Sequence, residues 1–206
     1  MRSADKHGKI IQSATKVFAK KGFFNARISD IAKEAKVADG TIYLYFNNKF
    51  DILLSVFEEE IGELIEELQL QLQLESDPRR KLEIFIANHL SAMKKNRNLA
   101  EVIQIELRQS HKQVRDYRNT RFCAYVDIIS SIVKEGQAAG LFRQDLLPGI
   151  VKRALFGALD EICRIWTQHL DTSYSLEQTM QQVIDLFLHG TLASPALPVA
   201  SPSSPY

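Results

Sequence analysis

Residues 37–46, VADGTIYLYF, contain the side chains with the clearest chemical use. Thr41, Tyr43 and Tyr45 carry hydroxyl groups, which can donate hydrogen bonds to phosphate oxygens. Leu44 offers aliphatic carbon, which can contact the methyl group of thymine. Hydroxyl donors and an apolar group so close together therefore indicate contacts with the backbone and bases of a nucleic-acid duplex.

Two further residues fit the same chemistry. Gly40 lacks a side chain, so a partner could approach its backbone closely. Lys49 can pair with a phosphate, as can the free N–H groups of the helix that it begins. Residues 1–50 hold ten Lys/Arg against four Asp/Glu, whereas 51–206 hold sixteen against twenty-one. On charge alone, phosphate binding and an ordinary solvated surface are equally good interpretations.

No enzyme motif accompanies these residues. The chain has no nucleophile elbow, P-loop or dinucleotide-binding glycine pattern. Cys123 and Cys163 lack a metal-binding spacing, and the histidines are dispersed. Asp160 and Glu161 are adjacent, so on a helix their side chains diverge by about 100°, which suits a catalytic pair poorly. We expect no enzyme, no metal and no cofactor; a helical enzyme or a pure interaction bundle is the alternative from another class.

The composition of the chain indicates where in the cell the protein is expected, the cytoplasm. The 206 residues include two cysteines, too few for a disulfide framework. There is no basic segment followed by a short apolar one, as in a secretory signal. No apolar run approaches the roughly 18 residues that cross a membrane. We therefore expect a cytoplasmic protein without membrane segments.

The elements that hold these side chains are expected to be helical. A lone strand over residues 41–46 would leave its backbone groups unpaired, so a short helix is favoured, with Asp39 or Ala38 at its N-cap. Ile42 and Phe46, four residues apart, would then face the core. Apolar residues at helical spacing predict further helices over 6–21, 29–35, 49–74, 79–95, 99–110, 112–138, 148–170 and 175–190.

These elements predict an all-α fold of about nine helices in two domains. Residues 1–48 are expected to form a three-helix helix-turn-helix domain, with Ser29 as the N-cap of its second helix. Residues 49–191 would form a helical ligand-binding and dimerisation domain. Residues 192–206 are rich in Ala, Ser and Pro and are expected to be a disordered tail.

The segment ISDIAKEAKVADGTIYLYFNNKFDIL resembles the N-terminal signature of TetR-type transcriptional regulators. The matching positions are Asp30-Ile31-Ala32, Ala35, Val37, Gly40-Thr41-Ile42-Tyr43, Tyr45-Phe46 and Lys49. The sequence departs from the family at Lys36, Ala38 and Phe50, where Gly, Ser and Glu are usual. The missing serine affects one expected phosphate contact, and Asp39 is expected to take over the capping.

The resemblance implies how such a protein binds DNA. The short helix carrying residues 40–45 would enter the major groove; Tyr43 and Lys49 match positions that hold the phosphate backbone, and Thr41, Leu44 and Tyr45 match positions near base edges. The predicted DNA-binding residues are Ser29, Asp39, Gly40, Thr41, Tyr43, Leu44, Tyr45 and Lys49. The family further implies a homodimer formed through the helices near 148–170 and 175–190, a palindromic operator in double-stranded DNA, and an effector pocket in the second domain.

A second resemblance concerns the effector. VADGTIYLYFNNKFDIL, IQIELRQS and FGALDEICRIW look like segments of the fatty-acid-degradation subgroup, whose members release DNA on binding long-chain acyl-CoA. An acyl-CoA needs an apolar channel for its chain and cations for its phosphates, and a basic cluster contains Arg108, Arg115, Arg118 and Arg121. The predicted ligand-binding residues are Phe85, His89, Met93, Leu107, Arg108, Arg115, Arg118, Phe122, Tyr125 and Trp166.

Other interpretations of this second domain remain open. Each apolar residue of the predicted pocket could simply fill the core of a helical bundle, and the arginines could be solvated. Within the same family, the effector could be a hydrophobic or cationic drug that releases a repressor of efflux genes.

Overall fold

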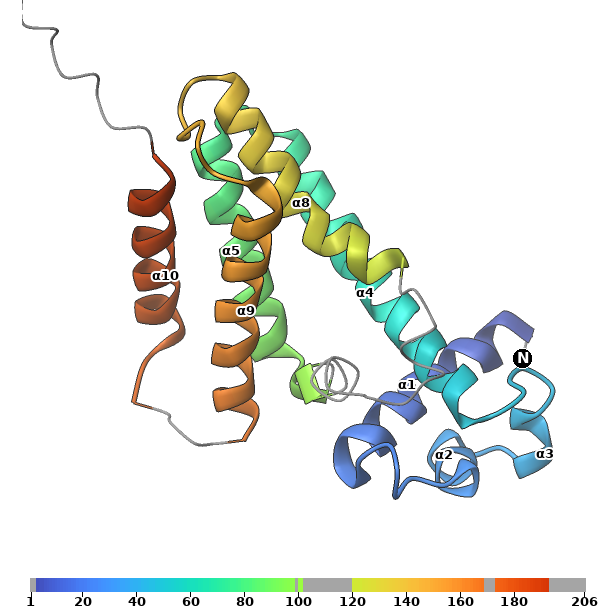
Figure 1. Ribbon diagram of the computed structural model, residues 1–206. Coiled ribbons are helices and arrows are strands. Elements are labelled where there is room, and N and C mark those ends of the chain that lie inside the picture. The colour runs from blue at the N-terminus through green and yellow to red at the C-terminus, as the bar shows by residue number, and fades with distance from the viewer. Residues whose placement is uncertain (1–2, 99, 102–119, 169–172, 193–206) are drawn as a thin grey trace, which may run out of the picture.

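The protein is helical throughout the part of the chain that its computed structural model describes, residues 3–98, 100–101, 120–168 and 173–192 (Figure 1). The helices are α1 (Ser3–Lys21), α2 (Ile28–Ala35), α3 (Asp39–Ile42), α4 (Lys49–Gln73), α5 (Pro78–Lys95), α8 (Thr120–Ala138), α9 (Pro148–Thr167) and α10 (Leu176–Thr191). The predicted all-α fold is confirmed. The predicted helix over 99–110, the start of that over 112–138, and the tail from 193 lie mostly or wholly outside the described residues.

The first hydrophobic core joins α1, α2, α3 and the beginning of α4. Its buried members include Phe18 of α1, Ile31 of α2 and Ile42 of α3, all with no exposed surface. Ile52, Leu53 and Val56 extend this core along the first two turns of α4. The helix-turn-helix is therefore one packed unit that includes the start of α4.

The short segment between α2 and α3 forms the turn of this unit. Lys36 adopts a left-handed conformation with φ 57° after the last turn of α2. The Val37 N–H donates to the carbonyl of Ala32 at 3.0 Å, which closes the helix end. The chain can then reverse direction within a few residues before α3 begins.

The predicted N-cap Ser29 was wrong, and of the two alternatives predicted for the N-cap of α3, Ala38 is confirmed and Asp39 is not. Arg27 is the N-cap of α2, and Ser29 lies inside its first turn. The Asp30 carboxylate accepts a hydrogen bond from the Arg27 backbone N–H at 3.0 Å, so a carboxylate in the helix satisfies the free donor before it. Ala38 is the N-cap of α3 without any side-chain hydrogen bond, so Asp39 does not cap that helix.

A second hydrophobic core surrounds the far part of α4, together with α5, α8, α9 and α10. It begins at Phe57, the residue after Val56, so hydrophobic packing divides within α4. The predicted domain boundary at 48–49, at the first residue of this helix, stays a prediction. Because α4 runs continuously through both cores, it is the direct mechanical link between them.

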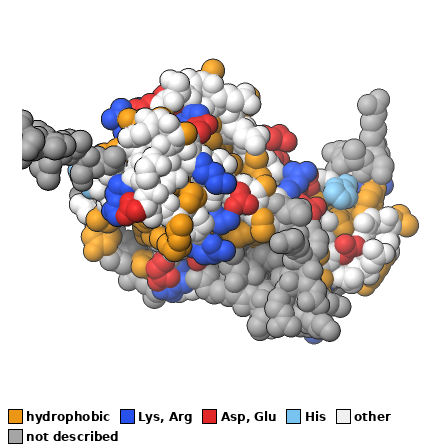
Figure 2. All heavy atoms as spheres, turned by 45° about the horizontal axis from the view of Figure 1, so that its top comes forward, with side chains coloured by type: hydrophobic (Ala, Val, Ile, Leu, Met, Phe, Trp, Pro, Cys, Tyr) orange, Lys and Arg blue, Asp and Glu red, His pale blue; other side chains and the backbone are white. Residues whose placement is uncertain are grey.

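The helices of the second core pack in pairs. Figure 1 shows α8 crossing beside α4, while α9 and α10 stand next to α5, and the packing joins α8 to α9 and α10 to α5. Figure 2 shows basic and acidic side chains interspersed on one face of the molecule. In the ranges given above, no helix combines the length and the apolar character needed to span a membrane.

Candidate nucleic-acid interface and effector domain

The helix-turn-helix presents two bulky side chains to solvent. In and just after α3, Ile42 is fully buried and Phe46 is 3% exposed, whereas Tyr43 is 58% and Leu44 is 79% exposed. The expected separation of core and surface side chains is thus confirmed for these four residues. An exposed leucine and tyrosine next to each other carry a cost unless a partner covers them.

The other two side chains predicted to lie near base edges are less exposed than Leu44. Thr41 and Tyr45 are only half exposed. The Tyr45 ring lies 6.1 Å from the ring of His7 in α1, in an edge-to-face arrangement. Tyr45 therefore contacts α1 through its ring, which restricts how far its hydroxyl can reach outward.

Gly40 and the two nearby polar residues lie on the surface. A Cβ added to Gly40 would meet no atom within 4 Å, so the fold itself does not require glycine there. Ser29 and Asp39 are exposed as well. Their position leaves all three accessible to a partner, while their roles in DNA binding stay predictions.

Lys49 points into the protein. Its Nζ donates to the carbonyl oxygens of Phe23 at 2.7 Å, Phe24 at 3.1 Å and Ala26 at 2.8 Å. The same ammonium lies 4.6 Å from the centre of the Phe23 ring. Burial lowers the pKa of Lys49 from its usual range. In this structure the ammonium of Lys49 is therefore bound to backbone carbonyls and is not positioned for the expected contact with a DNA phosphate.

A surface ion pair spans the α1–α2 turn that supplies these carbonyls. Lys21 forms an ion pair with Asp30 at 2.6 Å. The hydrogen bond from Lys21, together with that from the Arg27 backbone, holds the pKa of the Asp30 carboxyl below its usual range. This pair joins the end of α1 to the first turn of α2 at the protein surface, where such pairs contribute little stability.

The predicted effector residues that the structure describes lie in the second core. Phe85, His89, Met93 and Tyr125 are buried there, whereas Phe122 and Trp166 are partly buried. Lys94 Nζ lies 4.7 Å from the centre of the Trp166 ring. Leu107, Arg108, Arg115 and Arg118 lie outside the described residues, so a tunnel or a basic rim formed with them stays a prediction.

A polar cluster occupies the middle of this apolar core. The Nδ1 atom of His89 lies 2.9 Å from the hydroxyl of Tyr125, and its Nε2 lies 3.8 Å from Sγ of Cys163. The rings of Phe85, Tyr125 and Phe156 surround the imidazole. His89 thus contacts residues from α8 and α9 as well as its own helix.

Burial determines the charge state of this cluster. It lowers the pKa of His89 to about 4 and raises the pKa of Cys163 to about 12. The pKa of Tyr125 is also raised, chiefly by burial. At neutral pH the imidazole, thiol and phenol are all uncharged. A neutral thiol is a poor nucleophile, so the cluster offers hydrogen bonds rather than nucleophilic chemistry.

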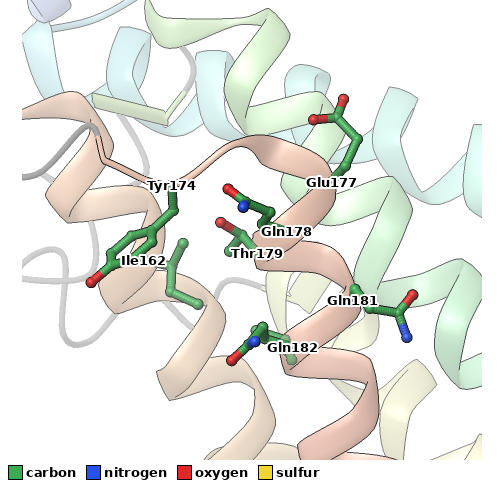
Figure 3. A pocket seen from close by; sticks show the side chains of 8 residues that line it. Ile162, Tyr174, Glu177, Gln178, Thr179, Gln181 and Gln182 are labelled. Carbon is green, nitrogen blue, oxygen red and sulfur yellow. The ribbon is translucent and has the colours of Figure 1, made fainter.

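Several hollows open on the surface of the described residues, and two of them border the predicted functional regions. One, of about 440 Å³, lies between α1, α4 and α8 and is lined by His7, Arg121 and several glutamates of α4. The other, a groove of about 840 Å³, lies between α9 and α10. Figure 3 shows Tyr174 and Ile162 opposite Thr179 and Gln182 across this groove. This groove lies on the two helices that were predicted to dimerise.

Sequence reasoning missed two of the contacts described here. It did not connect Cys163 with His89, because the pair is 74 residues apart and no spacing reveals it. It also overlooked Gly62, a glycine inside the long helical pattern of α4, where an added Cβ would stand 2.1 Å from Nη1 of Arg121 in α8. Such a glycine lowers helix stability and therefore signals a close packing contact. Among the described residues, no group of three His, Cys, Asp or Glu side chains could hold a metal ion.

The helix-turn-helix exposes bulky side chains, and its last helix continues into a second helical domain. This is the architecture of a class of transcriptional regulators. Residues 10–56 match the bacterial regulatory proteins of the tetR family, and residues 57–190 match the C-terminal region of YsiA-like proteins. The chain belongs to the tetR family and is a regulator, not an enzyme.

Similar proteins within this family point to one subgroup. The fatty acid metabolism regulator protein of Bacillus subtilis is 37% identical over 185 residues, covering 90% of this chain and 95% of that protein. The fatty acid degradation regulator FadR from Bacillus halodurans superposes with a TM-score of 0.84 at 36% identity, covering 92% and 98% of the two chains. The FadR of Bacillus subtilis in complex with stearoyl-CoA gives a TM-score of 0.83 at 37% identity, covering 89% and 98%.

Proposed function

We propose that the protein is a homodimeric repressor that binds a palindromic operator and is released by a long-chain acyl-CoA, and so controls genes of fatty-acid metabolism. The observation that carries the DNA-binding part is the exposure of Tyr43 and Leu44 beside the buried Ile42 and Phe46. A tyrosine hydroxyl and an aliphatic side chain at the protein surface match a phosphate and a thymine methyl.

The DNA contacts would be divided by chemistry. Tyr43 and Ser29 would hold phosphates through their hydroxyls, and Thr41, Leu44 and Tyr45 would lie near base edges. Asp39 and Gly40 begin α3, where the missing Cβ leaves room for the DNA backbone. In a dimer, two such helices would read half-sites about one helical turn apart.

The effector assignment is supported by the similarity to a regulator solved with stearoyl-CoA. In this chain the acyl chain would lie among Phe85, Met93, Phe122, Tyr125 and Trp166, near the His89 imidazole. The phosphates of the CoA moiety would meet the arginines of the basic cluster, Arg108, Arg115 and Arg118. Binding there would shift α4, which passes from the second core into the first.

The homodimer would form through α9 and α10. Tyr174 and Leu186 are 61% and 72% exposed in and before α10, and the groove of about 840 Å³ lies on the same face. An apolar groove flanked by exposed apolar side chains is a common site of protein–protein contact. A second copy of the same face would cover them around a two-fold axis.

The test is a fluorescence anisotropy titration with duplex DNA from the upstream region of the protein's own gene. We expect binding at low salt, and release by palmitoyl-CoA with a change in DNA affinity of about 5- to 150-fold, as allosteric coupling typically gives. Calorimetry with palmitoyl-CoA against a cationic dye separates the acyl-CoA effector from a drug effector. A folded dimer that ignores this DNA at low salt would refute the proposal.

A further inference from the structure

We propose that Lys49 is a positioning residue that fastens the first turn of α4 to the α1–α2 turn, and that it does not bind a DNA phosphate. The part of this inference that concerns operator binding rests on the proposed function. The structural part of it, the fastening itself, stands on the contacts of Lys49 alone.

The ammonium group of Lys49 has no donor left for DNA. A lysine ammonium has three N–H groups, and three carbonyl oxygens lie within 3.1 Å of Nζ. These carbonyls belong to Phe23, Phe24 and Ala26, all in the turn that follows α1. The Phe23 ring adds a fourth favourable contact to the cation. A phosphate would have to displace this complete set of partners.

Helix electrostatics favour the same direction for the side chain. Lys49 is the first residue of α4, where the partial positive charge of the helix N-terminus disfavours a cation. The α1–α2 turn begins at Gly22, directly after the last residue of α1, where the partial charge is negative. By reaching across, Lys49 moves its charge from an unfavourable helix end to a favourable one.

The contacts at the start of α4 also hold the segment that leaves α3. Asn48 caps α4 by accepting from the Asp51 N–H at 3.0 Å. The Asp51 carboxylate accepts from the backbone and side-chain nitrogens of Asn47 at 3.0 and 2.9 Å. Lys49 joins this same turn to the segment that precedes α2. The start of α4 is therefore bound both to the segment that leaves α3 and to the turn that leads into α2.

The experiment compares Lys49→Met with Lys20→Met in the full-length protein. Methionine keeps an unbranched stem and removes the ammonium. Lys20 is exposed in the last turn of α1, so its substitution removes the same charge without touching the fastening. Affinity for the operator duplex and for a shuffled duplex is measured by anisotropy between about 50 and 200 mM salt, the range in which phosphate contacts dominate.

For Lys49→Met we expect operator affinity to fall by about 10-fold, shuffled-duplex affinity to change by less than about 2-fold, and the salt slope to stay the same. A lost phosphate contact would instead weaken both duplexes and flatten the slope by about 0.9, which would overturn the proposal. Unchanged binding to both duplexes would overturn it too, because Lys49 would then affect stability alone.

Hydrogen exchange gives a readout that needs no operator. Amides of residues 22–27 should exchange faster in Lys49→Met than in wild type or Lys20→Met, since the turn loses its anchor. Equal exchange in all three proteins would show that the fastening does not exist. If the wild type had no operator preference, the proposed function would fail, and this exchange comparison would still decide the role of Lys49.

Discussion

Arg121 of α8 lies against the backbone of α4 at Gly62, so closely that a Cβ on Gly62 would stand 2.1 Å from Nη1 of Arg121. Both residues line the hollow between α1, α4 and α8. The contact thus joins a helix of the second core to the middle of the helix that enters the first core. Since the atom in the way is the end of a flexible side chain, it can move at little cost.

Gly62→Ala should therefore raise stability while removing this contact. Alanine is favoured over glycine inside a helix by about 1 kcal/mol, and displacing an exposed guanidinium offsets only part of this. Urea unfolding should show the gain. Gly62→Ala and its matched control, Arg121→Ala, each remove the same contact. Both should therefore change the palmitoyl-CoA-induced loss of DNA affinity by the same factor. If the double variant shows additive changes in that response, the two residues do not act through one contact.

Tyr125→Phe should destabilise the second core by about 1–3 kcal/mol, because it leaves the buried Nδ1 of His89 without its hydrogen-bond partner. Denaturant unfolding monitored by circular dichroism measures this. The control is Tyr43→Phe, measured without DNA, which alters a tyrosine that is 58% exposed and should change stability by less than about 0.5 kcal/mol. Equal effects of the two substitutions would contradict a stabilising His89–Tyr125 bond.

The buried His89 predicts a loss of stability in mild acid. Its pKa is about 4 in the folded protein and near 6.5 when unfolded, so the unfolded state takes up the proton first. The contribution is fully present above about pH 6.5 and is lost as the pH falls toward 4, by up to about 3 kcal/mol.

Unfolding of wild type and His89→Gln at several pH values between about 4 and 7 isolates this effect, because carboxylates that titrate in the same range are common to both. We expect the stability difference between the two proteins to shrink with acidity. The exposed His189 provides the control variant, His189→Gln, which should follow the wild-type curve. A difference that is independent of pH would refute the neutral buried imidazole.

Leu44→Ala and Ile42→Ala should separate DNA reading from folding. Leu44 is 79% exposed, so its truncation should leave stability within about 0.5 kcal/mol and reduce discrimination at one base position by about 1–3 kcal/mol. Ile42 is fully buried, so its truncation should cost about 2–5 kcal/mol of stability. Thermal melts and anisotropy with single-base operator variants measure the two effects. Loss of stability in Leu44→Ala would place that side chain in the core.

Much of the helical layout followed from local patterns. The period of apolar residues located most helix ends within a few residues, as for α4 and α5, because a helix that buries one face must repeat every three to four residues. A short helix was expected here because a lone strand would have had no partner, but α3 ends at Ile42, so Tyr43, Leu44 and Tyr45 lie in the turn that follows and not in the helix as predicted. The caps were harder to predict, since Asp30 satisfied the α2 terminus from inside the helix and made a capping Ser29 unnecessary.

The sequence by itself determined which side chains in and just after α3 face solvent, because that depends on spacing within about one helical turn. It also indicated the family, because the matching residues stand in one order along the single stretch from Asp30 to Lys49. Only the tertiary structure decided the direction of Lys49, the pairing of His89 with Tyr125, and the contact of Arg121 with Gly62. These partners lie on different elements: the carbonyls that Lys49 contacts belong to the α1–α2 turn, 23 to 26 residues away, and Tyr125 lies on another helix, 36 residues from His89. Their meeting depends on how whole helices pack, which no local periodicity encodes.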